Sequence, residues 1–266
     1  MSVGFVSSSS EYLKTAGTSI LNGLSAVTVA CWTYPTDLAN NLWFLNAWHT
    51  STGALKRQVG FRAAATSGEL HAFISTSTVY GGDLDLAVSV NSWQHVAMTW
   101  DGTTLKGYLD GSSTGSKTYT FGGSVQNQTD NELLLARYAA TYADMRVEDR
   151  AIWNRALGDD EIHALYAGRL RAVHIPNGLL HYWPLDAPGD SSYGDFTDGD
   201  YGGRDLVGDL PAILGAAPAW SPSSPGLHWS SQPYRVFTTP TDGQTAARRV
   251  SLGGTFIDST RVVLAG

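Results

Sequence analysis

The residues of this sequence that could bind a ligand are mostly aromatic side chains in loops or at strand ends. Sugar rings stack on aromatic faces while polar neighbours bind their hydroxyls, and the chain has 9 Trp and 12 Tyr. For any single one of these residues, a place in the core is the alternative role. The candidates for a carbohydrate-binding surface are Trp43, Trp48, His49, Tyr80, Tyr193 and Tyr201.

Aspartates gather in a second candidate site, between Asp186 and Asp209. Asp195, Asp198 and Asp200 could offer the hard oxygen ligands that calcium prefers. The segment lacks the bidentate Glu of an EF-hand loop, and a solvated acidic loop with local turns is the alternative interpretation. We expect no cofactor to be required, and calcium is the one candidate ion.

Catalytic patterns are missing. Paired-carboxylate hydrolases of β-sandwich type need acids two residues apart on one strand face, whereas Glu148 and Asp149 are adjacent and would point to opposite faces. The stretch from Gly111 to Gly115 matches G-x-S-x-G, but it joins two predicted strands and not a strand and a helix. The seven histidines show no zinc-binding spacing. The sequence therefore predicts no enzyme.

Composition limits the partners. The chain has 266 residues, 42% of them hydrophobic and only 15% charged, with a net charge of −7. An acidic chain is a poor match for nucleic acid, and no apolar run approaches the length of a membrane span. Cys31 alternates with apolar residues and is expected to be a small buried hydrophobe. The N-terminal residues lack an export signal, so we expect a protein used without export or one whose signal has been removed.

Short strands must position these side chains. Alternating or β-branched runs recur every 8–12 residues or so, separated by Gly, Asp and Pro turns, as in an antiparallel sandwich or jelly roll. Asp101-Gly102 between two such runs is the strongest hairpin signal. One helix is expected over 156–168, where Asp159, Asp160 and Glu161 would stabilise its N-terminus and Gly168 would end it.

Three segments carry a family resemblance: 27–35 (VTVACWTYP), 93–111 (WQHVAMTWDGTTLKGYLDG) and 152–162 (IWNRALGDDEI). Their sequences and order resemble the laminin-G-like branch of the concanavalin A-like lectin jelly rolls. The resemblance covers about residues 2–168 and implies an all-β fold, an antiparallel β-sandwich with one short helix. Gly158 replaces the family's usual Ser or Thr helix cap, so Asp159 is expected to cap the helix instead.

The C-terminal part departs from that pattern. Residues 178–186 resemble a strand that usually opens such a domain. We expect them to dock back on the same sandwich, and docking onto a neighbouring copy's sandwich in a swap is the alternative. We assign residues 1–218 to the sandwich and 219–266 to a C-terminal extended β arm. The arm is Pro- and Ser-rich at its start and would gain most by pairing with another chain's sheet edge; wrapping over its own domain is the alternative.

These features favour a non-enzymatic structural or accessory protein of a virion, such as a bacteriophage head-decoration, fibre or tail component. Laminin-G-like proteins that are similar to this chain, including its late YWPL segment, resemble proteins found in phage structural gene sets. The expected partners are other virion proteins of the capsid or tail lattice, which the arm would contact, and a cell-surface glycan. The protein itself is expected to be a homo-oligomer in the assembly. The expected location is the virion, assembled in the host cytoplasm. The alternative is a secreted or cell-surface carbohydrate-binding lectin, which would be extracellular.

Overall fold

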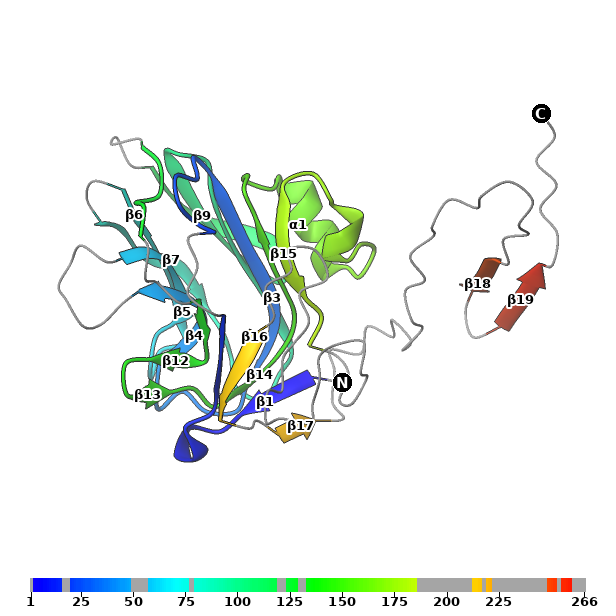
Figure 1. Cartoon of the computed structure of the whole chain (residues 1–266), viewed down its shortest axis with the longest axis horizontal. Coiled ribbons are helices and arrows are strands. Elements are labelled where there is room, and N and C mark those ends of the chain that lie inside the picture. The colour runs from blue at the N-terminus through cyan, green and yellow to red at the C-terminus, as the bar shows by residue number, and fades with distance from the viewer. Residues whose placement is uncertain are drawn as a thin grey trace. The chain divides into compact units, whose positions relative to one another are not determined.

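The computed structural model describes residues 2–15, 20–48, 57–76, 79–118, 123–128, 133–185, 212–216, 219–221, 248–252 and 255–259. Two antiparallel sheets pack face to face as a sandwich, with one helix against the first sheet (Figure 1). The chain divides into two compact units, Met1–His228 and Trp229–Gly266. The described part of the chain contains no helix long and apolar enough to cross a membrane.

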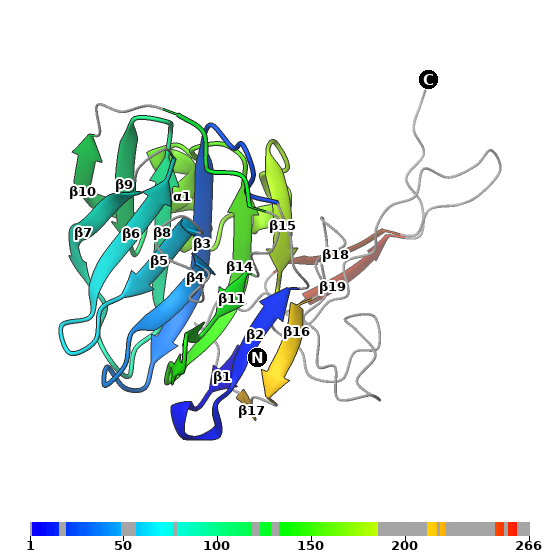
Figure 2. The same cartoon turned by 60° about the vertical axis from the view of Figure 1, so that its left-hand side comes forward.

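Sheet A consists, in spatial order, of β10 (Ser112–Thr118), β9 (Thr104–Leu109), β8 (Gln94–Trp100), β3 (Val27–Pro35), β14 (Met145–Trp153), β1 (Ser2–Phe5) and β17 (Ala219–Ser221), and β15 (Leu179–Trp183) also pairs with β14. Sheet B consists of β16 (Ala212–Ala216), β2 (Tyr12–Thr15), β11 (Leu134–Leu135), β4 (Leu42–Trp48), β5 (Arg57–Ala63), β6 (Glu69–Ser75) and β7 (Val79–Ala87). Figure 2 shows the strands of both sheets from a second direction. The antiparallel sandwich predicted from the sequence is confirmed.

The remaining elements are short. They are η1 (Ser7–Ser9), the hairpin of β12 (Arg137–Tyr138) and β13 (Thr141–Tyr142), α1 (Asp159–Tyr166) and η2 (Ala172–His174). In the second unit, β18 (Arg248–Leu252) and β19 (Thr255–Ser259) pair as an antiparallel hairpin.

The predicted hairpin at Asp101-Gly102 joins β8 to β9. The Asp101 carboxylate accepts the backbone N–H groups of Thr103 and Thr104 at 2.8 and 2.7 Å. Gly102 has a φ of +98°, a conformation that glycine adopts without a steric penalty. The turn sequence therefore determines the β8–β9 register, in which Trp100 faces Leu105.

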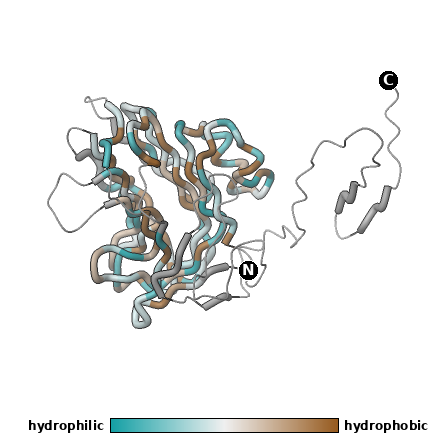
Figure 3. Tube along the Cα trace, in the orientation of Figure 1, coloured by the Kyte–Doolittle hydropathy of each residue, from teal (hydrophilic) through white to brown (hydrophobic). Residues whose placement is uncertain are grey.

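The core between the sheets follows from strand periodicity. Inward residues such as Val29, Met98, Phe61 and Ile74 belong to one cluster of buried hydrophobic side chains. Because side chains alternate across a strand, their neighbours point outward, and the alternation can be followed in Figure 3. Each sheet therefore has a second, outer face, and the two outer faces differ.

The outer face of sheet A is covered by α1. Three alanines lie side by side on this face: Ala151 of β14, Ala30 of β3 and Ala97 of β8. The next residue in the same line is Tyr108 of β9. These small side chains leave room for a second buried cluster, to which α1 contributes Ile162 and Leu165. Covering this face explains why every residue of β8 is buried, although an antiparallel strand with one solvated face would show alternation.

The helix cap differs from the prediction. Gly158 occupies the N-cap position and Asp159 is already helical, so the expectation that Asp159 caps the helix is wrong. The Glu161 carboxylate accepts the Gly158 N–H at 2.9 Å and pairs with Arg155 through two hydrogen bonds of 2.8 and 2.6 Å. The Glu161 side chain thus accepts a hydrogen bond from a backbone N–H at the start of the helix, although residue 158 has no capping side chain.

The late C-terminal strands pair within the first unit. β15 lies antiparallel to β14 of the same chain, with Tyr182 facing Ala151. β17 pairs with β1, and β16 pairs with β2. Residues 219–221, which the sequence analysis assigned to the arm, therefore lie at an edge of sheet A, and the compact unit that holds them extends to residue 228.

Candidate functional site

The outer face of sheet B carries a line of large polar and aromatic side chains. Trp43 of β4 faces Arg62 of β5, Arg62 faces His71 of β6, and His71 faces Asp83 of β7. We call these four residues the cross-strand row. Their chain neighbours Leu42, Phe61, Leu70, Ala72 and Leu84 are inside the core. The row therefore runs across four adjacent strands on the side away from the core.

An aromatic pair forms one end of the row. Tyr138 of β12 stacks on Trp43 with ring centroids 5.1 Å apart and an interplanar angle of 21°. Trp43 is only 5% exposed, whereas Tyr138 is half-buried. The Trp43 Nε1–H has no hydrogen-bond partner among the described residues. Tyr138, which the sequence analysis did not single out, is thus the ring at this end that is open to a ligand.

Arg62 occupies the middle of the row between two aromatic rings. Its guanidinium carbon lies 5.5 Å from the Trp43 ring centre and 5.8 Å from that of Phe73. It donates a hydrogen bond to Asn41, which also accepts the Ala65 N–H at 2.9 Å. Burial lowers the pKa of Arg62 from its usual value, yet arginine starts so far above neutrality that the group keeps its charge.

Phe73 lies beside the row and is flanked by glycines. Across the sheet it faces Gly60 on one side and Gly81 on the other, so neither directly opposite residue has a side chain beside the ring, and Arg62 is the cross-strand group that lies over it. Gly81 has a φ of +147°, and a Cβ there would lie 2.1 Å from the Ala72 carbonyl oxygen. A side chain at residue 81 would collide with the β6 backbone, so only glycine fits opposite Phe73.

Acidic groups form the other end of the row. Glu69, two residues before His71 on β6, shares the outer face, and its Oε2 lies 3.9 Å from the His71 Nε2. The Asp83 carboxylate accepts the Asp85 N–H at 2.8 Å. The face therefore offers aromatic rings, a cation, an imidazole and carboxylates within one patch, the set of groups that recognises the apolar faces and hydroxyls of sugars.

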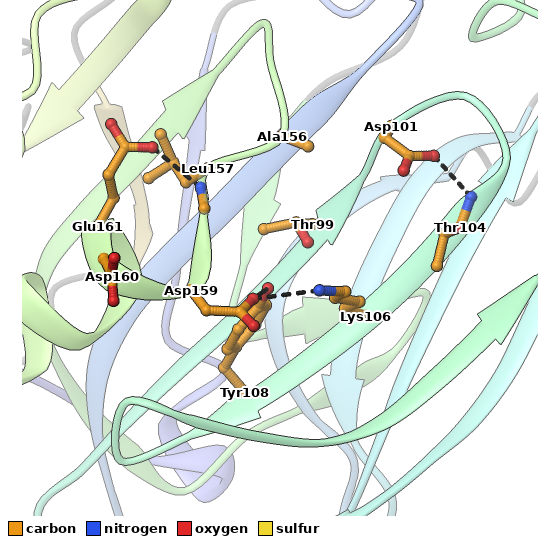
Figure 4. Close-up of a pocket in the computed structure, with 11 residues that line it drawn as sticks. Thr99, Asp101, Thr104, Lys106, Tyr108, Ala156, Leu157, Asp159, Asp160 and Glu161 are labelled. Carbon is orange, nitrogen blue, oxygen red and sulfur yellow. Dashed lines mark hydrogen bonds and ion pairs between the residues drawn. The ribbon is translucent and has the colours of Figure 1, made fainter.

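A second candidate is a groove of about 560 Å³ beside the N-terminus of α1 (Figure 4). The Tyr108 hydroxyl donates to the Asp159 carboxylate at 2.7 Å, and the Lys106 ammonium lies 3.2 Å from the same oxygen. The Tyr108 hydrogen bond, followed by that of Lys106, lowers the pKa of Asp159. Burial and the Asp159 carboxylate raise the pKa of Tyr108 to about 12.

The groups that line this groove bind one another. Tyr108 is fully buried, so it offers no ring face to a ligand. Tyr108 and Lys106 join β9 to the first residue of α1, which gives the constellation a role in holding the helix on sheet A. The outer face of sheet B is therefore the better candidate for ligand binding.

The structure describes only part of the predicted site. Trp43 lies in the cross-strand row but is buried beneath Tyr138. Trp48 and Tyr80 belong to β4 and β7, and their side chains are outside the described residues. Also outside the described residues are His49, Tyr193, Tyr201 and the calcium candidates Asp195, Asp198 and Asp200. For all of these, ligand binding stays a prediction.

Sequence reasoning missed the rest of the row. Arg62, His71 and Phe73 sit at alternating positions within runs that were recognised as strands, and this alternation predicts that 71 and 73 share a face. Which residues of β4, β5, β6 and β7 stand side by side depends on the strand registers. Two register shifts in the β4–β5 pair and one between β6 and β7 cannot be read from periodicity.

Comparison with known proteins gives a family and a fold. The family described as the concanavalin A-like lectin/glucanases superfamily, of laminin G type, matches residues 7–163. A candidate carbohydrate-binding protein from Bacteroides ovatus superposes with a TM-score of 0.59 at 13% identity, over 82% of this chain and 60% of that protein. No curated protein matches the sequence.

Two further solved structures are less similar. A heptameric pentraxin from Limulus polyphemus gives a TM-score of 0.48 at 16% identity, over 60% of this chain and 79% of that one. Domain 4 of an extracellular arabinanase from Geobacillus stearothermophilus, solved with arabinotriose, gives 0.43 at 17% identity, over 57% of this chain and 71% of that one.

Proposed function

The chain belongs to the concanavalin A-like lectin/glucanases superfamily, and from that premise we propose that it is a non-catalytic carbohydrate-binding protein whose ligand lies on the outer face of sheet B. The observation that carries the proposal is the cross-strand row. It places a cation, an imidazole and a carboxylate beside partly exposed aromatic rings, on a lectin-like sandwich.

Four groups on this face have a defined role in the proposal. The rings of Tyr138 and Phe73 pack against the apolar faces of sugar rings. Arg62 donates hydrogen bonds to ring or hydroxyl oxygens, and Asp83 accepts hydrogen bonds from hydroxyl groups. The candidate carbohydrate-binding protein from Bacteroides ovatus shares the sandwich fold and supports testing sugars before other ligands.

The test is a glycan array followed by isothermal titration calorimetry with the strongest binder. We expect Arg62→Met to weaken binding by about tenfold or more, because a charge-assisted hydrogen bond from a half-buried guanidinium is lost. Arg146→Met is the matched control: Arg146 lies 5.0 Å over the Tyr34 ring on sheet A, so the same change is made in the same kind of contact. Loss of affinity in both variants, or in neither, would contradict the proposal.

The absence of catalysis is tested on the same ligand. The carboxylates of Glu69 and Asp83 lie near each other, and two carboxylates about 5 Å apart are the arrangement of a retaining glycosidase. We expect no reducing sugar to be released when the bound glycan is incubated with the protein. Release that is abolished by Asp83→Asn would replace the binding function with hydrolysis.

A second proposal concerns attachment to a particle. Residues Trp229–Gly266 form a compact unit of their own that contains the β18–β19 hairpin, and such a unit suits docking onto a virion lattice. We expect the protein from its native source to co-sediment with nucleic-acid-containing particles, and expect deletion of this unit to abolish attachment while the sandwich stays folded. A protein that stays at the top of the gradient would favour the free lectin.

A further inference from the structure

Three metal-ligating side chains converge at the acidic end of the outer face of sheet B. Glu69 and His71 are two residues apart on β6 and so share a face, and Asp83 is the cross-strand partner of His71 on β7. One ligand atom from each residue lies within 4.8 Å of the other two. The register shift between Glu69 and His71 places Ala87 opposite Glu69, so a small side chain borders the cluster there.

From this geometry we infer that Glu69, His71 and Asp83 form a binding site for a divalent transition-metal ion, with Zn²⁺ as the best match. One imidazole and two carboxylates are typical ligands of zinc, manganese and non-haem iron. Calcium instead takes six to eight oxygens, more than these three residues provide. The site is separate from the calcium candidates of the sequence analysis and does not depend on the proposed glycan binding.

The carboxylates are oriented before any ion arrives. The Ser67 hydroxyl donates to the Glu69 Oε2 at 3.1 Å, and the Asp85 N–H donates to the Asp83 Oδ1 at 2.8 Å. Such outer hydrogen bonds fix the direction of metal ligands and strengthen their binding. Bringing the three ligand atoms to about 2 Å from one ion needs a movement of about 1 Å, which the half-exposed Glu69 side chain can supply.

The charges that face the cluster favour a cation. Glu69 and Asp83 bring two negative charges, and exposed Asp85 adds a third nearby on β7. The opposing charge is Arg62 on β5, the cross-strand partner of His71. Its guanidinium is directed toward the Trp43 and Phe73 rings and Asn41. The acidic end of the row therefore keeps a net negative charge toward an incoming ion.

The experiment uses the full chain without glycan. We expect ZnCl₂ to raise the melting temperature and to bind with one equivalent in calorimetry. His71→Ala should weaken binding by about tenfold or more, since an imidazole ligand is lost. His163→Ala removes an exposed histidine on α1 and is the matched control, expected to bind like wild type.

A spectroscopic readout separates the site from nonspecific binding. Co²⁺ in place of Zn²⁺ should give visible absorption bands in wild type and in His163→Ala, and these bands should be lost in His71→Ala. Asp83→Asn keeps the size of the side chain and removes one charge, so it tests the site even if His71→Ala fails to fold. The inference is overturned if wild type binds no Zn²⁺, or if Asp83→Asn and a folded His71→Ala bind it as wild type does. Either result leaves the glycan test with Arg62→Met unaffected.

Discussion

The outer faces of the two sheets differ in the residues that stand side by side across the strands. On sheet A, three alanines in successive strands are flanked by Tyr182 and Tyr108, and α1 packs on them. On sheet B, the corresponding line contains an indole, a guanidinium, an imidazole and a carboxylate. A row of small residues accepts a helix, whereas a row of large polar residues keeps the face accessible. Whether an outer face is covered or stays exposed to solvent therefore depends on which residues of adjacent strands lie side by side, and not on the pattern within one strand.

The largest effect on stability is expected when a charge is placed on the face of sheet A that α1 covers. Ala97 is fully buried between Ala30 and Tyr108. We expect Ala97→Asp to lower the free energy of unfolding by about 3–5 kcal/mol, because an unpaired carboxylate would be buried. Urea unfolding measures the loss.

The same substitution at exposed Ala87, on β7, is the control. We expect it to cost less than about 1 kcal/mol, including repulsion from Glu69. Equal effects at the two positions would show that α1 does not seal sheet A.

Acid should destabilise the protein through His95, which is buried on the covered face of sheet A. Burial lowers the pKa of His95 to about 3, and its ring lies edge-on to Trp32 under the helix layer. Between about pH 3 and pH 6.5 the unfolded chain binds a proton that the folded chain does not, so stability falls as the pH falls through this window. The slope is at most about 1.4 kcal/mol per pH unit.

His95→Phe removes the titrating group and keeps a ring against Trp32. We expect the stability of this variant, measured by urea unfolding between pH 4 and pH 7, to depend less steeply on pH than that of wild type. An unchanged slope would mean that folding does not lower the pKa of His95.

A smaller effect is expected where the helix is tied to the sheet. Tyr108→Phe removes the hydroxyl that donates to Asp159, and we expect a loss of about 1–2 kcal/mol at neutral pH. The bond lowers the pKa of Asp159, so its contribution is present above the carboxyl's unfolded pKa and is lost as the pH falls through the folded one.

Thermal unfolding of wild type and Tyr108→Phe should therefore differ at pH 7 and converge in acid. A difference that stays constant down to the acid range would assign the loss to packing and not to the hydrogen bond.

The open face should tolerate change best. Tyr138→Ala removes the ring stacked on Trp43, and we expect a loss of only about 0.5–1 kcal/mol. Its clearer signature is optical: Trp43 becomes exposed to water, which shifts the fluorescence emission to longer wavelength. Tyr142→Ala, in the partner strand β13, is the control and should leave the emission unchanged.

Local signals in the sequence carried much of the fold. Asp101-Gly102 makes a turn through its own carboxylate, and the apolar positions of α1 are three or four residues apart, so both could be predicted from neighbours. The helix cap could not be predicted in this way, because the group that accepts the Gly158 N–H is the Glu161 side chain, within the helix itself. The cross-strand row could not be predicted either: Trp43 and Arg62 become neighbours through register shifts that depend on packing of the whole sheet.

The pairing of β1 has a consequence for how the protein is made. This N-terminal strand finds its two neighbours only in residues 145–147 and 219–221. At about 5–20 residues per second, a ribosome takes on the order of 10 s or more to reach the second of them. The pairing of β1 is therefore completed only after most of the sandwich has been synthesised, and during translation its open edge is a place where a chaperone or a neighbouring nascent chain can bind.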